Sequence, residues 1–449
     1  MGRNVLPERI GCKWGHGRCG WQLCPEIRCY DSAALTSLTR ETLLEVAERF
    51  GTPAYVYDAA IFRKQLASLA AFDTVRFAQK ACPNIHVQRL FRAAGASVDC
   101  VSVGELERAL AAGFSVGKEH SEIVFTADVL TREALERVVQ TRVPVNAGSE
   151  DMLTQLGERS PRHPVWLRIN PGFGHGHSKK VNTGGESSKH GIWHENLSLA
   201  LERVDRHGLD LIGLHLHIGS GADIEHLKQV CHAMVDLVKR ADRDLKAVSG
   251  GGGLSIPYTR DSSPVDVSAY YEHWHSARVQ IEKHLGHKVD LEIEPGRYLT
   301  AQAGVLLAEV RATKDVGSNH FTLVDAGFND LVRPAMYGAH HELSLLSRSG
   351  DASSRPERAT VVAGPLCESG DVFTQNAQAD VVPRLLPEAQ VGDLMLFHDA
   401  GAYGSSMSSN YNSRPLIPEV LVDEGQLKLI RRRQTLDELL DLERNATDG

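Results

Sequence analysis

The sequence predicts an α/β protein in which a parallel (β/α)₈ barrel is followed by a second, mostly antiparallel β domain. Eight short apolar runs, separated by segments with helical periodicity, recur within about 250 residues, the usual size of such a barrel. Polar residues and glycines gather at the C-terminal ends of these runs. After residue 310 the pattern changes to β-like runs joined by turns, without a long helix.

The composition is that of an ordinary globular protein. Of the 449 residues, 42% are apolar and 24% are charged. No run approaches the roughly 18 apolar residues of a membrane span. The net charge of −8 is mild, and the basic run at 431–433 is short and followed by acidic residues. Neither a membrane nor a nucleic acid is therefore an expected partner, and the basic run should lie on a solvated face.

The cysteines fall into two groups. Four are scattered through a chain without a secretory signal, which indicates a reducing, cytoplasmic compartment: Cys82, Cys100, Cys231 and Cys367. The other four crowd residues 1–35 without the CxxC spacing of common zinc sites: Cys12, Cys19, Cys24 and Cys29. We expect this N-terminal extension to be disordered, with a metal knuckle as the alternative. It also lacks the apolar core of a signal peptide.

The first ordered segment, residues 36–60, contains "TPAYVYD" (52–58), a β-like run expected to join the second domain. The barrel is assigned to residues 61–310. Its candidate strands are 75–80, 98–102, 122–127, 144–149, 165–172, 211–219, 246–253 and 290–296. The segments between them, such as "GELERALAAG", carry apolar residues three and four positions apart, as amphipathic helices do.

The second domain is assigned to residues 311–449. Its β-like runs include "HFTLVDAG", "ATVVAGPLC", "DLMLFHDAGAY" and "PEVLVDEGQLKLIRR". A polar stretch at 347–360 is expected to form an exposed loop.

Active sites of (β/α)₈ barrels lie at the C-terminal rim of the strands. Lys80 ends the first candidate strand, where loss of hydration would favour the neutral amine. A neutral amine can form a Schiff base with a carbonyl cofactor, although most strand-end lysines are simply solvated. The glycine run at 249–253 follows the seventh strand and Arg297 follows the eighth. Loops at these two places often bind phosphate.

Three further residues on the rim suit an aromatic, phosphate-bearing cofactor. Glu294, at the end of the eighth strand, could hold the ring nitrogen of pyridoxal phosphate protonated, which makes the ring an electron sink. His217 could lie flat against such a ring, or it could be an ordinary core histidine. Ser220 could donate a hydrogen bond to the phosphate.

One loop places a thiol and two carboxylates between glycines. The stretch "GPLCESGD" (364–371) is too short and too broken for a helix. It is either a solvated surface loop or a loop that delivers Cys367 and Glu368 to a cofactor bound elsewhere. Asp371 is expected to cap the loop and to take no part in catalysis.

Six ordered motifs resemble the diaminopimelate decarboxylases, a family of barrel-type (fold-type III) pyridoxal-phosphate enzymes. The motifs are "FAQKACPN", "HLHIGSG", "GGGLSIPY", "EPGRYLTAQAG", "GPLCESGD" and "GAYGSSMSSNYNSRP", in register from about residue 36 to 440. Four further stretches resemble the enterobacterial form: "VNAGS", "RINPGFGHGHS", "SKHGIW" and "DAGFNDLVRPAMYG". Gln88 departs from the family, in which this helical position is usually apolar. We expect a change of packing there and no loss of activity.

The resemblance implies a set of roles. Lys80 would carry the cofactor, Glu294 would pair with its ring nitrogen, and His217 would stack on the ring. The other residues implied in cofactor binding are Ser220, Gly252, Pro295, Gly296, Arg297 and Tyr403. Those implied in substrate binding are Arg297, Arg333, Tyr337, Glu368 and Tyr403.

The resemblance also implies a homodimer with shared active sites, because Cys367 and Glu368 would reach the partner's cofactor. Glu368 would suit the distal ammonium of the substrate. Either Cys367 or Lys80 would return a proton after carbon dioxide leaves, and the sequence does not distinguish them.

The implied reaction is decarboxylation of meso-2,6-diaminopimelate at its D-centre to L-lysine, the last step of lysine biosynthesis. Two alternatives stay open. One is a sibling decarboxylase acting on ornithine, arginine or a carboxy-polyamine. The other is a binding protein without catalytic activity. The histidines of "HGH" (175–177) form only a weak metal signal, and we interpret them as part of a lid, so no metal is expected.

Overall fold

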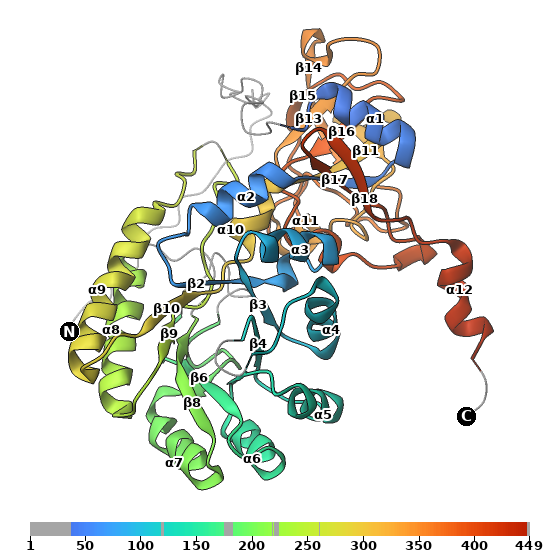
Figure 1. The fold of residues 1–449 in the computed structure, drawn as a ribbon. Helices are drawn as coiled ribbons and strands as arrows, with labels where there is room; N and C mark the ends of the chain where they lie inside the picture. Colours follow the sequence, from blue (N-terminus) through green and yellow to red (C-terminus); the bar gives the residue numbers. More distant parts are fainter. Residues whose placement is uncertain are drawn as a thin grey trace, which may run out of the picture.

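The computed structural model describes residues 37–117, 121–174, 183–217, 219, 224–259 and 261–446. Figure 1 shows a barrel wrapped by helices, with a second sheet at one end of it. The N-terminal extension with its four cysteines, the histidines at 175–177 and Ser220 lie outside the described residues, so the expectations for them stay predictions.

Eight parallel strands close the barrel, as predicted. They pair in the order β2–β3–β4–β5–β6–β8–β9–β10, and β10 pairs with β2 to complete the circle. The strands are β2 (Thr74–Ala78), β3 (Ser97–Cys100), β4 (Ile123–Ala127), β5 (Val145–Ala147), β6 (Pro164–Asn170), β8 (Asp210–Leu216), β9 (Ala247–Ser249) and β10 (Asp290–Ile293). A two-residue strand, β7 (Ile192–Trp193), pairs with the end of β6.

Several strands end earlier than the sequence suggested. β2 ends at Ala78, so Lys80 lies in a short 3₁₀ turn (Gln79–Ala81) beyond the strand. β9 ends at Ser249 because the glycines that follow leave the extended conformation, with φ of +62° at Gly251 and +117° at Gly253. The chemically important residues therefore lie on turns just past the strands.

Helices cover the outside of the barrel. They are α2 (Ala59–Ala67), α3 (Ile85–Ala93), α4 (Val103–Ala112), α5 (Arg132–Thr141), α6 (Glu150–Arg159), α7 (Leu197–His207), α8 (Ile224–Ala241), α9 (Val267–Leu285) and the short α10 (Arg297–Thr300). Polar side chains cap several of them: the Ser102 hydroxyl, for example, accepts a hydrogen bond from Glu105 N at 3.2 Å. Each helix packs an apolar stripe on the strands, such as Leu106 and Ala109 of α4.

The second sheet is mixed but mostly antiparallel, as expected. Its strand order is β15–β14–β12–β11–β1–β17–β18, and β16 pairs with both β11 and β13. The strands are β1 (Ala54–Asp58), β11 (Gly304–Val316), β12 (Asn319–Val324), β13 (Leu343–Leu346), β14 (Glu357–Ala363), β15 (Arg384–Pro387), β16 (Leu394–Phe397), β17 (Glu419–Asp423) and β18 (Gln426–Arg431).

β1 connects the two parts of the molecule. It pairs antiparallel with β11 and parallel with β17, so a strand that precedes the barrel lies inside the second sheet. Alternate side chains of a strand face opposite sides. Ala54 and Val56 pack with α1 (Arg40–Phe50), whereas Tyr55 and Tyr57 belong to the large core that includes the barrel.

The second part contains two short helices that the β-rich pattern did not predict. α11 (Arg333–Tyr337) lies beside the active-site cavity described below. α12 (Leu436–Arg444) begins with a capping box between Thr435 and Glu438, and none of its residues is buried. Of the basic run at 431–433, only Arg432 is exposed, where it pairs with Glu438. The expectation of a solvated face is wrong for the other two, because Arg431 pairs with the buried Glu419 at 2.9 Å and Arg433 donates to Pro53 O at 2.9 Å. The loop expected at 347–360 is shorter, because β14 begins at Glu357.

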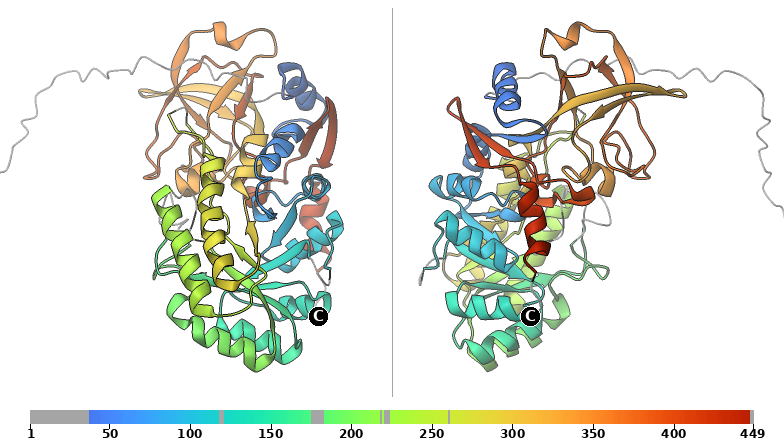
Figure 2. Two further views of the ribbon diagram at one scale, coloured as in Figure 1. Left: turned by 60° about the vertical axis from the view of Figure 1, so that its left-hand side comes forward. Right: turned by 90° about the vertical axis from the view of Figure 1, so that its right-hand side faces the viewer.

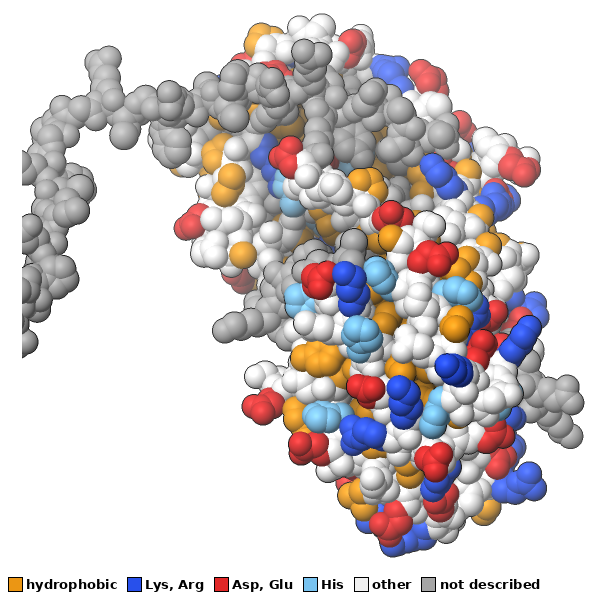
Figure 3. All heavy atoms as spheres, turned by 90° about the vertical axis from the view of Figure 1, so that its left-hand side faces the viewer, with side chains coloured by type: hydrophobic (Ala, Val, Ile, Leu, Met, Phe, Trp, Pro, Cys, Tyr) orange, Lys and Arg blue, Asp and Glu red, His pale blue; other side chains and the backbone are white. Residues whose placement is uncertain are grey.

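Charged side chains of both signs cover the outside of the barrel. Figure 2 shows the helices, the barrel and the second sheet from two further sides. On the face drawn in Figure 3, acidic and basic side chains are interspersed and form no large patch of one sign. None of the described helices combines the length and hydrophobicity needed to cross a bilayer.

Candidate active site

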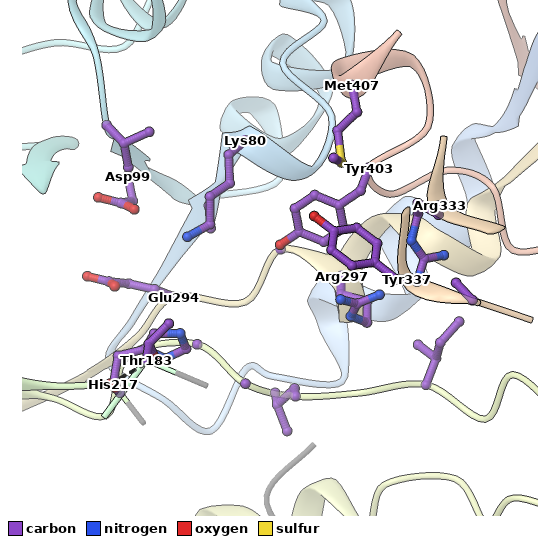
Figure 4. A pocket seen from close by; sticks show the side chains of 18 of the residues that line it. Lys80, Asp99, Thr183, His217, Glu294, Arg297, Arg333, Tyr337, Tyr403 and Met407 are labelled. Carbon is purple, nitrogen blue, oxygen red and sulfur yellow. Dashed lines mark hydrogen bonds between the residues drawn. The ribbon is translucent and has the colours of Figure 1, made fainter. Parts of the chain in front are cut away.

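A cavity of about 630 Å³ opens at the C-terminal rim of the barrel, where α11 and the loop after β16 face the strand ends. Figure 4 shows that the polar side chains that line it form two groups. At one end lie Lys80, Asp99, His217 and Glu294; at the other lie Arg297, Arg333, Tyr337 and Tyr403. We call these the lysine end and the arginine end. A role for each of these residues except Asp99 was predicted from the sequence.

Lys80 is held at the lysine end by its turn. Tyr403 N donates to Ala81 O at 2.8 Å, which ties the loop after β16 to this turn. The Lys80 amine points between the carboxyl groups of Asp99 and Glu294 (Figure 4). Its side chain remains exposed to the cavity, contrary to the expectation that the barrel mouth strips water from it.

Gln88 contributes to the support of this turn. It is fully buried on α3, and its Nε2 donates to Gln79 Oε1 at 2.7 Å and to Pro83 O at 3.1 Å. Gln79 Nε2 in turn donates to Glu105 O at 3.0 Å. The departure at Gln88 therefore adds polar contacts next to Lys80, beyond the simple change of packing that we expected.

Two buried carboxyl groups flank the lysine, and their environments differ. His215 Nε2 lies 2.7 Å from Glu294 Oε2. Burial opposes ionisation of Glu294, but the charge and hydrogen bond of His215 outweigh it and lower the pKa of this carboxyl. Burial and then the charge of Glu294 raise the pKa of Asp99 well above its usual value. The surroundings therefore favour the ionised form of Glu294 and disfavour that of Asp99.

His217 follows β8 and lines the same end of the cavity. Burial, together with the charges of Arg168 and Lys80, lowers its pKa well below the usual value, so the ring is neutral. Its Nδ1 has no hydrogen-bond partner among the described residues. A neutral imidazole of this kind suits stacking on an aromatic ligand.

The glycines of the rim make room for a ligand close to the backbone. A Cβ on Gly252 would lie 2.6 Å from Glu294 O, and one on Gly253 would lie 2.6 Å from Gly219 O. A Cβ on Gly296 would lie 3.0 Å from Ala78 O. Side chains at these positions would clash with neighbouring backbone carbonyls, so glycine is required where the rim loops pack this closely.

The arginine end holds two cations without counter-ions. Neither Arg297 nor Arg333 forms an ion pair with a carboxylate in the part of the chain that the structure describes. Arg297 Nη1 donates to the Tyr258 hydroxyl at 2.6 Å, and its Cζ lies 5.0 Å from the ring centre of Tyr403. Arg333 Nη1 lies 2.9 Å from His341 Nε2. This end is therefore prepared for an anion.

Three predicted site residues do not line this cavity. Pro295 is buried behind it, and its carbonyl accepts from Ala78 N at 3.2 Å. Cys367 and Glu368 are exposed on the loop 364–371, outside the cavity of their own chain.

That loop has a defined structure. Asp371 is buried and accepts hydrogen bonds from Leu366 N at 2.8 Å and Phe328 N at 2.7 Å, so it caps the loop as predicted. Cys367 N donates to Asn412 Oδ1 at 2.9 Å, and the Tyr411 hydroxyl donates to Glu368. The thiol and the carboxylate are thus presented on the surface by a fixed frame.

Sequence reasoning missed several residues of the site. His215 lies two positions before His217, and residues at this spacing on a strand point to the same face. The sequence could therefore have placed His215 beside His217 in the site. Tyr258 lies just beyond the glycine run. Arg168 lies on a predicted strand and begins the motif "RINPGFGHGHS", but nothing local shows that its side chain, or that of His341, lies beside the cavity.

The comparisons with known proteins agree with this geometry. The family "Pyridoxal-dependent decarboxylase, pyridoxal binding domain" matches residues 58–301. The chain belongs to this class of barrel decarboxylases. Within the class it belongs to the diaminopimelate decarboxylases. It is 60% identical over 409 residues to the enzyme of Escherichia coli (strain K12), covering 91% of this chain and 97% of that one. To that of Streptomyces coelicolor it is 61% identical over 398 residues, covering 89% and 90%.

Solved structures are similar in the same way. A crystal structure of diaminopimelate decarboxylase has a TM-score of 0.89 at 60% identity and covers 91% of this chain and 97% of its own. The Helicobacter pylori enzyme complexed with L-lysine has a TM-score of 0.80 at 27% identity, with coverage of 90% and 99%. The fold class and family predicted from the sequence are therefore confirmed.

The cofactor of this family is pyridoxal phosphate, and the residues present fit it. The ionised Glu294 suits a protonated ring nitrogen, and the glycines that line the cavity, Gly252, Gly253 and Gly296, suit a phosphate. Lys80 lies at the same end of the cavity for covalent attachment. In the described part of the chain, no three histidine, cysteine or acidic side chains come together as a metal site.

Proposed function

We propose that this chain removes carbon dioxide from the D-centre of meso-2,6-diaminopimelate and yields L-lysine, the last step of lysine biosynthesis. The observation that carries the proposal is the arginine end of the cavity. Arg297 and Arg333 lie opposite Lys80 without carboxylate partners among the described residues. A substrate with a second carboxylate would neutralise them while its other end reaches the lysine.

When bound, pyridoxal phosphate withdraws the electrons left behind as carbon dioxide departs. The chain's own residues prepare this step. Glu294 holds a negative charge where the ring nitrogen would lie, and His215 keeps that carboxylate ionised. His217 offers a flat neutral ring, and the glycines offer N–H groups to the phosphate. Arg297 and Arg333 orient the substrate from its far end.

The same charges argue against the sibling decarboxylases. Ornithine and the polyamines carry an ammonium at the far end, and an ammonium about 4 Å from an arginine is repelled by about 4 kcal/mol near a protein surface. Diaminopimelate carries both a carboxylate and an ammonium there. The arginines would bind the carboxylate, and a separate acid is needed for the ammonium.

We further propose that this acid is Glu368 of a partner subunit, in a cytoplasmic homodimer. Glu368 and Cys367 are exposed, lie outside their own cavity and are held on a fixed loop. Tyr411, which bonds to Glu368, is also 40% exposed, and Met336 on α11 is 43% exposed. A second chain seated here would cover them and receive the thiol and the carboxylate.

The test is release of carbon dioxide from meso-, LL- and DD-diaminopimelate and from ornithine, with and without added pyridoxal phosphate. We expect release from the meso isomer and none from ornithine. Consumption of ornithine with the meso isomer untouched would contradict the proposal. To address a binding protein without activity, borohydride reduction with the cofactor should label the wild-type chain at Lys80 and leave Lys80→Ala unlabelled.

A further inference from the structure

Tyr258 contacts both arginines of the arginine end. Its hydroxyl accepts a hydrogen bond from Arg297 Nη1 at 2.6 Å. The Cζ of Arg333 lies 4.9 Å from the centre of its ring, and the Cζ of Arg297 lies 5.7 Å from the same centre. Tyr258 comes from the loop between β9 and α9, whereas the arginines come from α10 and α11. One neutral side chain thus joins three separate elements at the cavity.

Two guanidinium groups this close together need a partner that does not cancel their charge. Both guanidinium groups lie over the same ring, and burial, together with the charge of Arg297, lowers the pKa of Arg333. The negative face of an aromatic ring reduces the repulsion between two cations without supplying a counter-ion. A carboxylate at position 258 would pair with the arginines and leave less charge for a ligand. A tyrosine keeps the site cationic.

Arg333 is also held from its other side by a neutral group. His341 Nδ1 lies 2.8 Å from His398 O, and because a carbonyl only accepts, this nitrogen carries the proton. His341 Nε2 is therefore the acceptor for Arg333 Nη1 at 2.9 Å. Arg297 Nε, meanwhile, is buried without a hydrogen-bond partner among the described residues. Such a donor requires an acceptor, which a bound carboxylate supplies.

We propose that Tyr258 is a positioning residue that sets specificity for a substrate with a second carboxylate, by holding Arg297 and Arg333 together as one anion site. The inference rests on the proposed function, since it assigns that site to the distal carboxylate of diaminopimelate. The reaction removes only the other carboxylate. The product L-lysine therefore keeps the group that Tyr258 helps to bind, and pentane-1,5-diamine lacks it.

The experiment compares Tyr258→Phe and Tyr258→Leu in the full-length, cofactor-loaded protein. KM and kcat are measured for meso-diaminopimelate. Inhibition constants are measured for L-lysine and for pentane-1,5-diamine, with binding followed by cofactor absorbance. Tyr271→Phe is the matched control, because Tyr271 is equally half-buried and its hydroxyl accepts from Arg278 Nη2 at 3.3 Å, but on α9 away from the cavity. The thermal midpoint of each variant reports folding.

For Tyr258→Phe we expect KM for meso-diaminopimelate and the L-lysine inhibition constant to rise together by about 10- to 100-fold, the usual effect of losing a hydrogen bond to a charged group. The kcat should change by less than about twofold. Tyr258→Leu also loses the ring, so its rise should be larger. The inhibition constant of pentane-1,5-diamine should stay unchanged, and Tyr271→Phe should match the wild type.

The inference is overturned if L-lysine binds Tyr258→Phe as tightly as the wild type, or if L-lysine and the diamine weaken equally. It is also overturned if kcat falls while KM stays constant. If the leucine variant fails to fold, the phenylalanine variant decides alone. Failure of the wild type to release carbon dioxide would reject the proposed function, while the absorbance titrations with L-lysine would still test Tyr258.

Discussion

Glu294 and Asp99 are two carboxyl groups in one buried cavity, and their surroundings move their pKa values in opposite directions. His215 lies 2.7 Å from Glu294 and keeps it ionised. Asp99 has no such histidine partner among the described residues, and burial, followed by the charge of Glu294, raises its pKa. The negative charge of Glu294 is thereby favoured where the cofactor ring needs it.

Replacing Glu294 by glutamine should test this assignment. Glutamine keeps the shape but cannot hold a ring nitrogen protonated, so kcat for carbon dioxide release should fall by about 10²–10³-fold, the range seen when one preorganised electrostatic contact is lost. Cofactor absorbance and the thermal midpoint check that the variant is loaded and folded. A kcat within about threefold of the wild type would remove Glu294 from this role.

Asp399 predicts a pH dependence of stability. It is 6% exposed, and burial followed by the charge of Glu342 raises its pKa to about 7. The folded state thus binds a proton that the unfolded state has released, so this group lowers stability as pH rises from about 4 to about 7. The substitution Asp399→Asn would place a neutral side chain here at every pH, and asparagine tolerates the left-handed φ of +53° at this position.

In denaturant titrations, the advantage of Asp399→Asn over the wild type should therefore grow by about 2–3 kcal/mol between about pH 5 and pH 8. An advantage that stays constant, or that shrinks with rising pH, would contradict the sign of this argument.

At the scale of elements, sequence periodicity located the barrel strands but not their ends. Apolar runs mark where a strand is buried, whereas the end of β9 depends on the φ angles of Gly251 and Gly253. The sequence did not predict α12, because none of its residues is buried and the helix therefore carries little core signal; only the Thr435–Glu438 capping box marks its start.

Some residues of the candidate site could likewise be predicted from the sequence, and others could not. Lys80 and Glu294 could be predicted because they follow strand ends directly. Tyr258 and His341 could not, because they act through contacts between distant segments: His341 reaches Arg333 only after β16 brings His398 beside it. Such pairings depend on tertiary structure, which no local pattern contains.

The seam that closes the barrel lies between its first and last strands, and a buried ion pair crosses it. Arg76 of β2 donates to Glu292 of β10 at 2.6 and 3.0 Å, and its Nη1 donates to Ser121 O at 3.1 Å. Both side chains are 6% exposed. Arg76→Ala would leave Glu292 buried without a partner, and breaking a buried pair in this way costs about 3–5 kcal/mol.

The loss should appear as a lower midpoint in urea with an unchanged slope. Arg137→Ala is the matched control, because Arg137 pairs with Glu107 at a similar 2.6 Å but at 32% and 50% exposure. That variant should lose less than about 1 kcal/mol. If both variants lost the same free energy of unfolding, the buried Arg76–Glu292 pair would contribute no more to stability than an exposed pair.

At the scale of the whole molecule, the cavity is built by both parts of the chain. The barrel supplies Lys80 and Glu294, while the second part supplies Arg333 and Tyr403, and Tyr403 N is bonded to Ala81 O beside the lysine. Cys367 and Glu368 belong to the same second part but face outward. The outward loop makes sense as part of a site only if another copy of the chain receives it.

Mixing two inactive variants tests that requirement directly. Lys80→Ala lacks the cofactor lysine, and Cys367→Ala lacks the thiol proposed to reach the partner's site. If each site takes its lysine from one chain and its thiol from the other, a mixed dimer has one intact site and one doubly defective site. Random exchange makes half of the dimers mixed, so an equimolar mixture should recover about a quarter of wild-type activity.

Subunits should be exchanged in mild denaturant, refolded with pyridoxal phosphate and assayed for carbon dioxide release. The control is the double variant Lys80→Ala, Cys367→Ala mixed with the wild type. In its mixed dimers one chain carries both substitutions. If the sites are shared, each site then lacks either its lysine or its thiol, so these dimers are inactive and only the wild-type dimers contribute activity. If both residues instead served the same chain's cavity, the two single variants would stay inactive together while the control mixture gained activity from its mixed dimers. If Cys367 serves the partner's cavity, only the mixture of single variants gains activity from its mixed dimers. If Cys367 serves the cavity of its own chain, only the control mixture does.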